Sequence, residues 1–424
     1  MKTRLILLFS LVLGCLPANA QTDRDPTTIN PALYYYQAFI LAPNLSSEDE
    51  NYLASVGTDG WIVPERAGKL LEGFDRVFDY VQKAARSKVP CDWGMDWTPG
   101  PETLLPQLGR CKAVAIKDRL RFRLDLQQGN QAKACDEWIA TLCLARNTSR
   151  DQALIGTLVQ FAMESILVDT VARNYELITP DSAVRLLSGI DAAPSRGTVA
   201  EPVAAEAGMH RKFLTRKIQM LREQSSGNES VVFENLHQCF LEMLRASGDS
   251  SDADKTAEEQ WQRIASAAGG TSDGILVLVD ELTAVTRRGA EILALPRPEY
   301  EVQIKQFLPT IVNSKNPLVA MDLPSFAKSR TKEFAVEAQM ALLRAALENK
   351  IHGTGGLQSV MDPFGTGPLA YERFTFKGQD RGFRLTSALA DPSRLSELIL
   401  VEKDGPPFMV QGINIGKALP LPKQ

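Results

Sequence analysis

The chain has 424 residues, and 44% of them are hydrophobic, which is enough to form real cores in two or three domains. Its 47 Lys and Arg residues nearly balance 51 Asp and Glu residues, for a formal net charge of −4. A mildly acidic surface of mixed sign argues against nucleic acid as a partner, and the apolar content excludes a largely disordered chain.

The first twenty residues have the form of a secretory signal peptide. Lys2 and Arg4 precede an apolar run at 5–13, and Ala18 and Ala20 provide the small side chains that signal peptidase requires. We expect cleavage after Ala20 and a secreted or periplasmic mature protein.

A lipid anchor is the alternative for this N-terminus. Residues 12–15 resemble a lipobox, in which Cys15 would be acylated and become the first residue. No later stretch approaches the roughly 18 consecutive apolar residues of a membrane span, so no transmembrane segment is expected.

Helices are predicted for most of the region 30–192. Asn30 and Pro31 have the pattern of an N-cap and first-turn proline for a helix over 32–41, and Ser46 with Asp49 has the pattern of a second helix start. Apolar residues at helical spacing predict amphipathic helix over 68–87. Three consecutive tyrosines, at 34–36, fan across a helix, so at least one must enter the core.

A helical hairpin is predicted at 104–146. Gly129 marks its turn, and Ala134 and Trp138 follow at the offsets of a tetratricopeptide-like unit. No second copy follows at the expected period, so an irregular helical array is favoured over a regular solenoid.

The predicted domains are a signal peptide at 1–20, an N-terminal helical domain at 21–195, a second helical block at 196–350 and a C-terminal segment at 351–424. In the last segment the apolar period changes to two, with short strands predicted at 371–376, 382–386, 397–401 and 408–413. The predicted fold class is therefore mostly α, an irregular array of helical hairpins with a small C-terminal antiparallel β meander.

Five cysteines remain after cleavage: Cys91, Cys111, Cys135, Cys143 and Cys239. An odd number leaves at least one thiol unpaired within the chain. Cys91 and Cys111 are the first candidates for a disulfide, which would join a loop to the following helix. The alternative is that all five are buried free thiols.

The loop 91–100 concentrates groups that suit a ligand. Asp92, Trp93, Asp96 and Trp97 combine flat aromatic faces with carboxylates, as in sites for sugars or cationic ligands. The favoured alternative is a Gly- and Pro-punctuated loop that inserts its indole rings into the helical core and uses its Asp side chains in turns.

Signals for metal, cofactor or nucleophilic chemistry are weak. Glu206 with His210, and His237 with Cys239, do not match a known metal-ligand spacing, and helix-surface pairing explains them. No H-E-x-x-H motif and no phosphate-binding glycine loop is present, and no metal, cofactor or catalytic residue is predicted. The basic residues at 210–217 have the pattern of a solvated helix face.

Two sets of motifs resemble an uncharacterised family of bacterial secreted helical proteins. These are the Cys-Asp-Trp-Gly run at 91–94 with Leu-Leu-Pro at 104–106, and the Asp-Pro-Phe-x-x-x-Pro-Leu-x-Tyr segment at 362–371. The tail alone also resembles the end of pseudopilin-like subunits. Neither resemblance implies an activity.

The sequence thus predicts a non-catalytic envelope protein whose helices bind a protein or peptide partner. The alternative function is a secreted hydrolase that uses a carboxylate pair, with carbohydrate as the candidate substrate and Asp92 and Asp96 near it.

Overall fold

The computed structural model describes residues 25–59, 62–247, 253–322, 324–376, 378–390 and 395–402. These residues are mostly helical and end in a three-stranded antiparallel sheet, which confirms the predicted fold class. The signal peptide, Cys15 and the strand predicted at 408–413 lie outside the described residues.

Four short helices form the N-terminal part: α2 (Pro31–Leu41), α3 (Ser47–Asp59), α4 (Glu65–Glu72) and α5 (Asp75–Ala85). The predicted caps are present, since Asn30 accepts a hydrogen bond from the Ala32 amide and Ser46 accepts one from the Asp49 amide. Of the three tyrosines, Tyr34 and Tyr35 are buried, as the fan of a helix requires.

The helical prediction over 68–87 is confirmed for α4 and α5, but the chain breaks between them at Gly73 and Phe74. Leu71 and Phe74 serve different hydrophobic clusters, one under α3 and α4 and the other between α2 and α5. A Cβ on Gly73 would lie 3.4 Å from the Pro43 ring, so the turn brings the chain close to the end of α2. The break thus lets both halves bury an apolar face.

The predicted hairpin is formed by α6 (Pro106–Gln127) and α7 (Gln131–Thr148), with Gly129 at a φ of 81° in the turn. Ala134 and Trp138 are fully buried, and the Trp138 indole donates to the Leu167 carbonyl on α8 (Leu154–Arg173). Among the described residues, α8 has the length and composition of a membrane span, but 72% of its apolar window is buried in this core.

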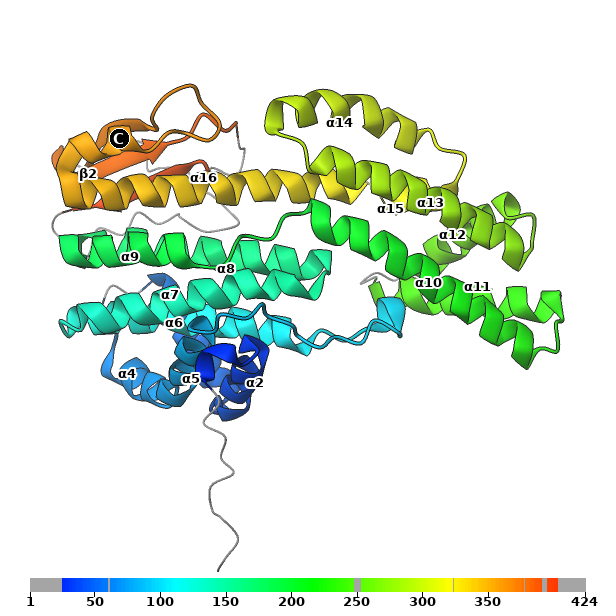
Figure 1. The fold of residues 1–424 in the computed structure, drawn as a ribbon, viewed down its shortest axis with the longest axis horizontal. Coiled ribbons are helices and arrows are strands. Elements are labelled where there is room, and N and C mark those ends of the chain that lie inside the picture. Colours follow the sequence, from blue (N-terminus) through cyan, green and yellow to red (C-terminus); the bar gives the residue numbers. More distant parts are fainter. Residues whose placement is uncertain are drawn as a thin grey trace, which may run out of the picture.

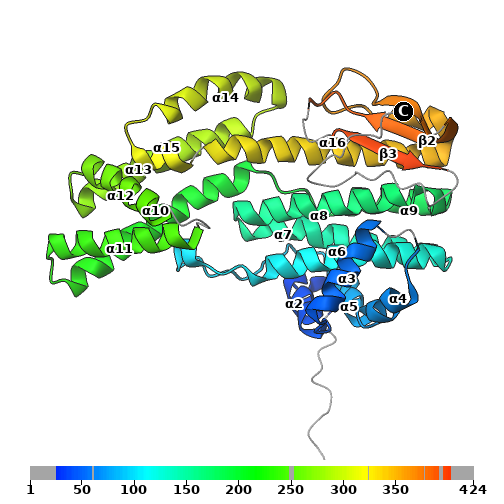
Figure 2. The ribbon, with the colours of Figure 1, turned by 180° about the vertical axis from the view of Figure 1, so that it is seen from behind.

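The long helix α16 (Pro324–His352) runs from the sheet to α15, near the middle of the molecule (Figures 1 and 2). Its second half shares one hydrophobic core with α6 to α8, with α9 (Pro180–Ala192) and with the sheet. Its first half packs in another core, against α13 (Ser272–Leu293), α14 (Arg297–Val312) and α15 (Pro317–Asp322). The described parts of the three predicted regions of the mature chain are therefore connected through α16.

The remaining helices extend to one side, away from the sheet (Figure 1). They are α10 (Ala200–Gln224), α11 (Glu229–Ser247) and α12 (Ala253–Ala267), which pack with α13 around a fourth hydrophobic cluster. The cluster includes Trp261, Ile264, Ile275 and Val279.

The sheet contains β1 (Ala370–Phe376), β2 (Gln379–Thr386) and β3 (Glu397–Val401), in the order β1-β2-β3. Three of the four predicted strands are thereby confirmed. The Asp-Pro-Phe segment before β1 is anchored by Asp362, whose carboxylate accepts hydrogen bonds from Phe364 N at 3.0 Å and Ser387 Oγ at 2.7 Å. This motif therefore has a structural role in joining the tail to β2.

Candidate functional site

Trp93 lies in the core. Only 3% of its surface is exposed, and its Nε1 donates to the Asn147 carbonyl at 2.8 Å. Its ring stacks on Tyr35 with 5.5 Å between centroids and lies parallel to Phe39. The Trp93 face is thus occupied by protein, as the core-insertion alternative predicts.

The two carboxylates of the loop serve local turns. Asp92 accepts from the Gly94 amide at 2.9 Å, and Asp96 accepts from the Thr98 amide at 2.8 Å. The Thr98 side chain and amide both lower the pKa of Asp96. Asp92 and Asp96 are exposed and Trp97 is half-buried. The hydrolase that would use Asp92 and Asp96 stays a prediction.

The five cysteines described in the structure are free thiols. Cys91 and Cys111 lie in the same hydrophobic cluster, and burial raises the pKa of each to about 12. Burial also raises the pKa of Cys135 and Cys143 to about 11. Cys91 and Cys111 are not bonded to each other in the structure. The disulfide between them therefore stays a prediction. Cys239 differs from the other four because it is only half-buried.

The histidines considered as ligands have other contacts. His237 stacks on Trp261 with 4.9 Å between centroids, and its Nε2 lies 2.9 Å from a Glu258 carboxylate oxygen. Glu206 accepts a hydrogen bond from the Leu154 amide at 2.7 Å, at the start of α8. In the described ranges, no three His, Cys, Asp or Glu side chains form a group that could hold a metal ion.

A cavity of about 430 Å³ lies among α10, α11, α12, α13 and α15, at the end of the molecule away from the sheet. This volume falls in the range of roughly 300–1,000 Å³ that is typical of small-molecule sites. Its lining residues are Glu102, Val203, Glu206, Ala207, His210, Phe213, Leu214, Lys217, Leu236, Cys239, Phe240, Trp261, Ile264, Ile275, Val279, Leu282, Thr283, Thr286 and Leu318.

One stripe of α10 forms a wall of the cavity. Val203, Ala207, His210, Leu214 and Lys217 recur at steps of three and four residues, which places them on one side of the helix. The stripe is apolar at Val203 and Ala207 and ends in Lys217. The wall from α13 is built in the same way by apolar side chains such as Ile275 and Val279.

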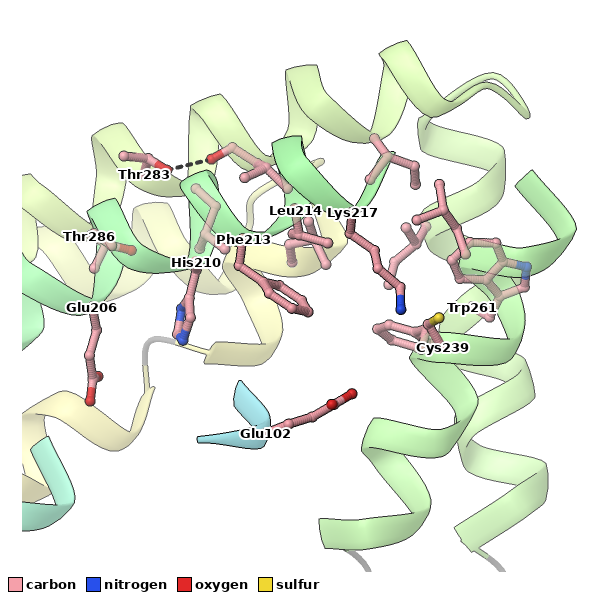
Figure 3. A pocket seen from close by; sticks show the side chains of 18 of the residues that line it. Glu102, Glu206, His210, Phe213, Leu214, Lys217, Cys239, Trp261, Thr283 and Thr286 are labelled. Atoms are coloured by element: carbon pink, nitrogen blue, oxygen red, sulfur yellow. Dashed lines mark hydrogen bonds between the residues drawn. The ribbon is translucent and has the colours of Figure 1, made fainter. Parts of the chain in front are cut away.

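The charged residues of the lining are less buried than its threonines (Figure 3). Glu102 is exposed and Lys217 is half-buried, whereas Thr283 and Thr286 are buried. Lys217 and Glu102 point toward one another from opposite sides, Lys217 from α10 and Glu102 from the short 3₁₀ helix η3 (Gly100–Glu102). Neither side chain has a hydrogen-bond or ion-pair partner among the described residues. Thr283, in contrast, donates to the Val279 carbonyl within its own helix.

The sequence reasoning missed this cavity. The residues at 210–217 were interpreted as a solvated face, and Arg211, Lys212 and Arg216 are indeed exposed. His210 and Lys217 are half-buried and line the cavity instead. The signal that could have predicted the cavity wall was the apolar stripe through Val203, Ala207 and Leu214. This stripe continues at helical spacing to His210 and Lys217 in the basic stretch.

Comparisons with protein families, curated proteins and solved structures found no match to this chain. The resemblance to a secreted family therefore stays a prediction. Any functional conclusion has to come from the site itself.

Proposed function

We propose that this chain is a non-catalytic binding protein of the extracytoplasmic space, and that it takes an apolar ligand into the cavity between α10 and α13. The observation that carries this proposal is a largely apolar volume of about 430 Å³ whose charged lining residues are exposed or half-buried. Apolar ligands gain free energy on leaving water for such a space, and a few edge groups then fix their orientation.

The contacts of two polar lining residues, Glu206 and Thr283, favour a binding role for them over a catalytic one. The Glu206 carboxylate is engaged with the α8 N-terminus, and the Thr283 hydroxyl is engaged within its helix. A general base needs free access to a substrate proton, and a nucleophile needs a base within hydrogen-bond reach. Glu206 and Thr283 meet neither condition.

Cys239 allows a direct test, because it lines the cavity and is less buried than the other described cysteines. We expect the mature protein to bind the neutral dye Nile red at one site. Prior reaction of Cys239 with a bulky maleimide should abolish this binding, because the adduct occupies the cavity.

The matched control is Cys239→Ser treated with the same reagent, which should bind the dye as the untreated protein does. Absence of dye binding by the unmodified protein would refute the proposal. Equal binding by the alkylated protein would refute it as well.

A protein partner is a second candidate, favoured by an exposed apolar face on α2. Leu33, Ile40 and Leu41 are exposed at spacings that place them on one side of the helix, and Ile40 is 82% exposed. Cross-linking in the native envelope should then recover one or two proteins in near-stoichiometric amount. Their recovery should be lost with Ile40→Glu, and equal recovery with this variant would refute the role of α2.

A further inference from the structure

The chemistry at the edge of the cavity points to the class of ligand. Within the lining set, Lys217 is the one Lys or Arg side chain, and it is half-buried. Its aliphatic stem can extend the apolar wall while its ammonium group stays near water. An ammonium without a partner, placed beside an apolar cavity, is suited to an anionic group attached to an apolar body.

The charges around Lys217 reinforce this polarity. Lys212 is exposed and has no partner among the described residues, and Arg216 donates to a neutral group, the Thr98 carbonyl. Arg211 is the basic neighbour paired with an acid, Asp280. This part of α10 therefore carries uncompensated positive charge.

The acidic lining residues oppose that charge only weakly. The carboxylate of Glu206, which extends from α10, lies at the N-terminus of α8. There its negative charge is compensated by the helix dipole and by the Leu154 amide. Glu102 is exposed, so water and salt screen its negative charge more strongly than they screen the positive charge of the half-buried Lys217. The edge of the cavity thus favours an anion over a cation.

We propose that the cavity binds a single-chain amphiphile with a monoanionic head, of the type of a long-chain carboxylate. The hydrocarbon chain lies among Phe213, Leu236, Phe240, Ile264 and Val279, and the carboxylate is bound by the Lys217 ammonium group. One lysine matches one negative charge. This inference rests on the proposed function, since it names the ligand of the same cavity.

Calorimetric titration of the mature protein with three probes of equal chain length tests the inference: dodecanoate, 1-dodecanol and dodecylammonium, each below its aggregation concentration. Dodecanoate should bind the wild-type protein about tenfold more tightly than it binds Lys217→Gln, because the variant loses a charge-assisted hydrogen bond. 1-Dodecanol should bind both proteins alike.

The matched control is Lys212→Gln, which removes an exposed charge from the same helix without touching the cavity. It should change dodecanoate affinity by less than about twofold. Shortening the probe to decanoate should weaken binding by up to about 15-fold, because each buried methylene contributes about fourfold.

The outcomes separate the two proposals. If 1-dodecanol binds, and dodecanoate binds the wild type and Lys217→Gln with equal affinity, the proposal of an anionic ligand is refuted. The cavity then remains a binding site. Tighter binding of dodecylammonium, lost in Glu102→Gln, would overturn the anionic ligand in favour of a cationic head. Failure of all three probes to bind would refute both proposals.

Discussion

Asp151 should limit the stability of this protein at neutral pH. Its side chain is buried at the start of α8, where Oδ1 accepts a hydrogen bond from Ala153 N and Oδ2 has no partner. Burial raises the pKa of Asp151 from 3.8 to about 6, against the lowering effect of the Ala153 amide. In Asp151→Asn, the amide oxygen keeps the acceptor for Ala153 and the titration disappears.

The sign and size of the effect follow from proton linkage. Below pH 3.8 the carboxyl group is protonated in both states and costs nothing. As the pH rises, the unfolded chain loses the proton first, so the free energy of unfolding falls until the folded carboxyl ionises near pH 6. A change in pKa from 3.8 to about 6 corresponds to about 3 kcal/mol at neutral pH and about 1 kcal/mol near pH 4.5.

Urea unfolding followed by circular dichroism at pH 4.5 and pH 7.5 measures this difference. We expect Asp151→Asn to be more stable than the wild type at both pH values, with the gain about 2 kcal/mol larger at pH 7.5. The matched control is Asp79→Asn, which alters an exposed carboxylate and should change little at either pH. A gain that does not depend on pH, or a variant less stable than the wild type at pH 7.5, would refute the reasoning.

Three further substitutions test the packing described above, each by urea unfolding. Trp93→Ala should lose about 3–5 kcal/mol, because it removes a buried ring and its bond to Asn147, yet it should leave dye binding by the folded protein unchanged; lost dye binding would place the site at the 91–100 loop instead. Glu164→Gln should cost about 3–5 kcal/mol, since the fully buried carboxylate pairs with both Arg146 and Arg196, and a neutral effect would mean that this pairing is not needed. Gly274→Ala should destabilise by about 1–3 kcal/mol or more and weaken dye binding, because its Cβ would lie 1.8 Å from the Ala268 carbonyl oxygen next to the cavity wall at Ile275; the wild-type stability and affinity would contradict this account.

Local signals in the sequence were sufficient to predict most of the fold. Asn30 with Pro31, the turn at Gly129 and the change of period near Tyr371 act through neighbouring residues, so the sequence displays them directly. The break at Gly73 was missed because it depends on two separate hydrophobic clusters, of which one contains Leu71 and the other contains Phe74. Helical spacing alone does not show which cluster each residue joins.

The candidate site was harder to predict for a similar reason. A cavity arises from the relative positions of several helices, and no short motif records how α10, α11, α12 and α13 pack around it. The loop around Trp93 was predicted as a candidate site because its aromatic and acidic groups are adjacent in sequence. In the structure, the Trp93 ring stacks with Tyr35 and Phe39 instead. The sequence pattern did not distinguish Lys217 from the neighbouring basic residues, which are exposed to water.

The most direct test of the cavity as a binding site is the rate at which Cys239 reacts with a small alkylating reagent, measured by peptide mass spectrometry with and without saturating 1-dodecanol. Cys239 lines the cavity and is less buried than the other described cysteines. The account predicts that the alcohol slows alkylation of Cys239 at least tenfold, in proportion to occupancy. An unchanged rate at Cys239 under conditions in which the protein binds the alcohol would place the ligand elsewhere and contradict the account.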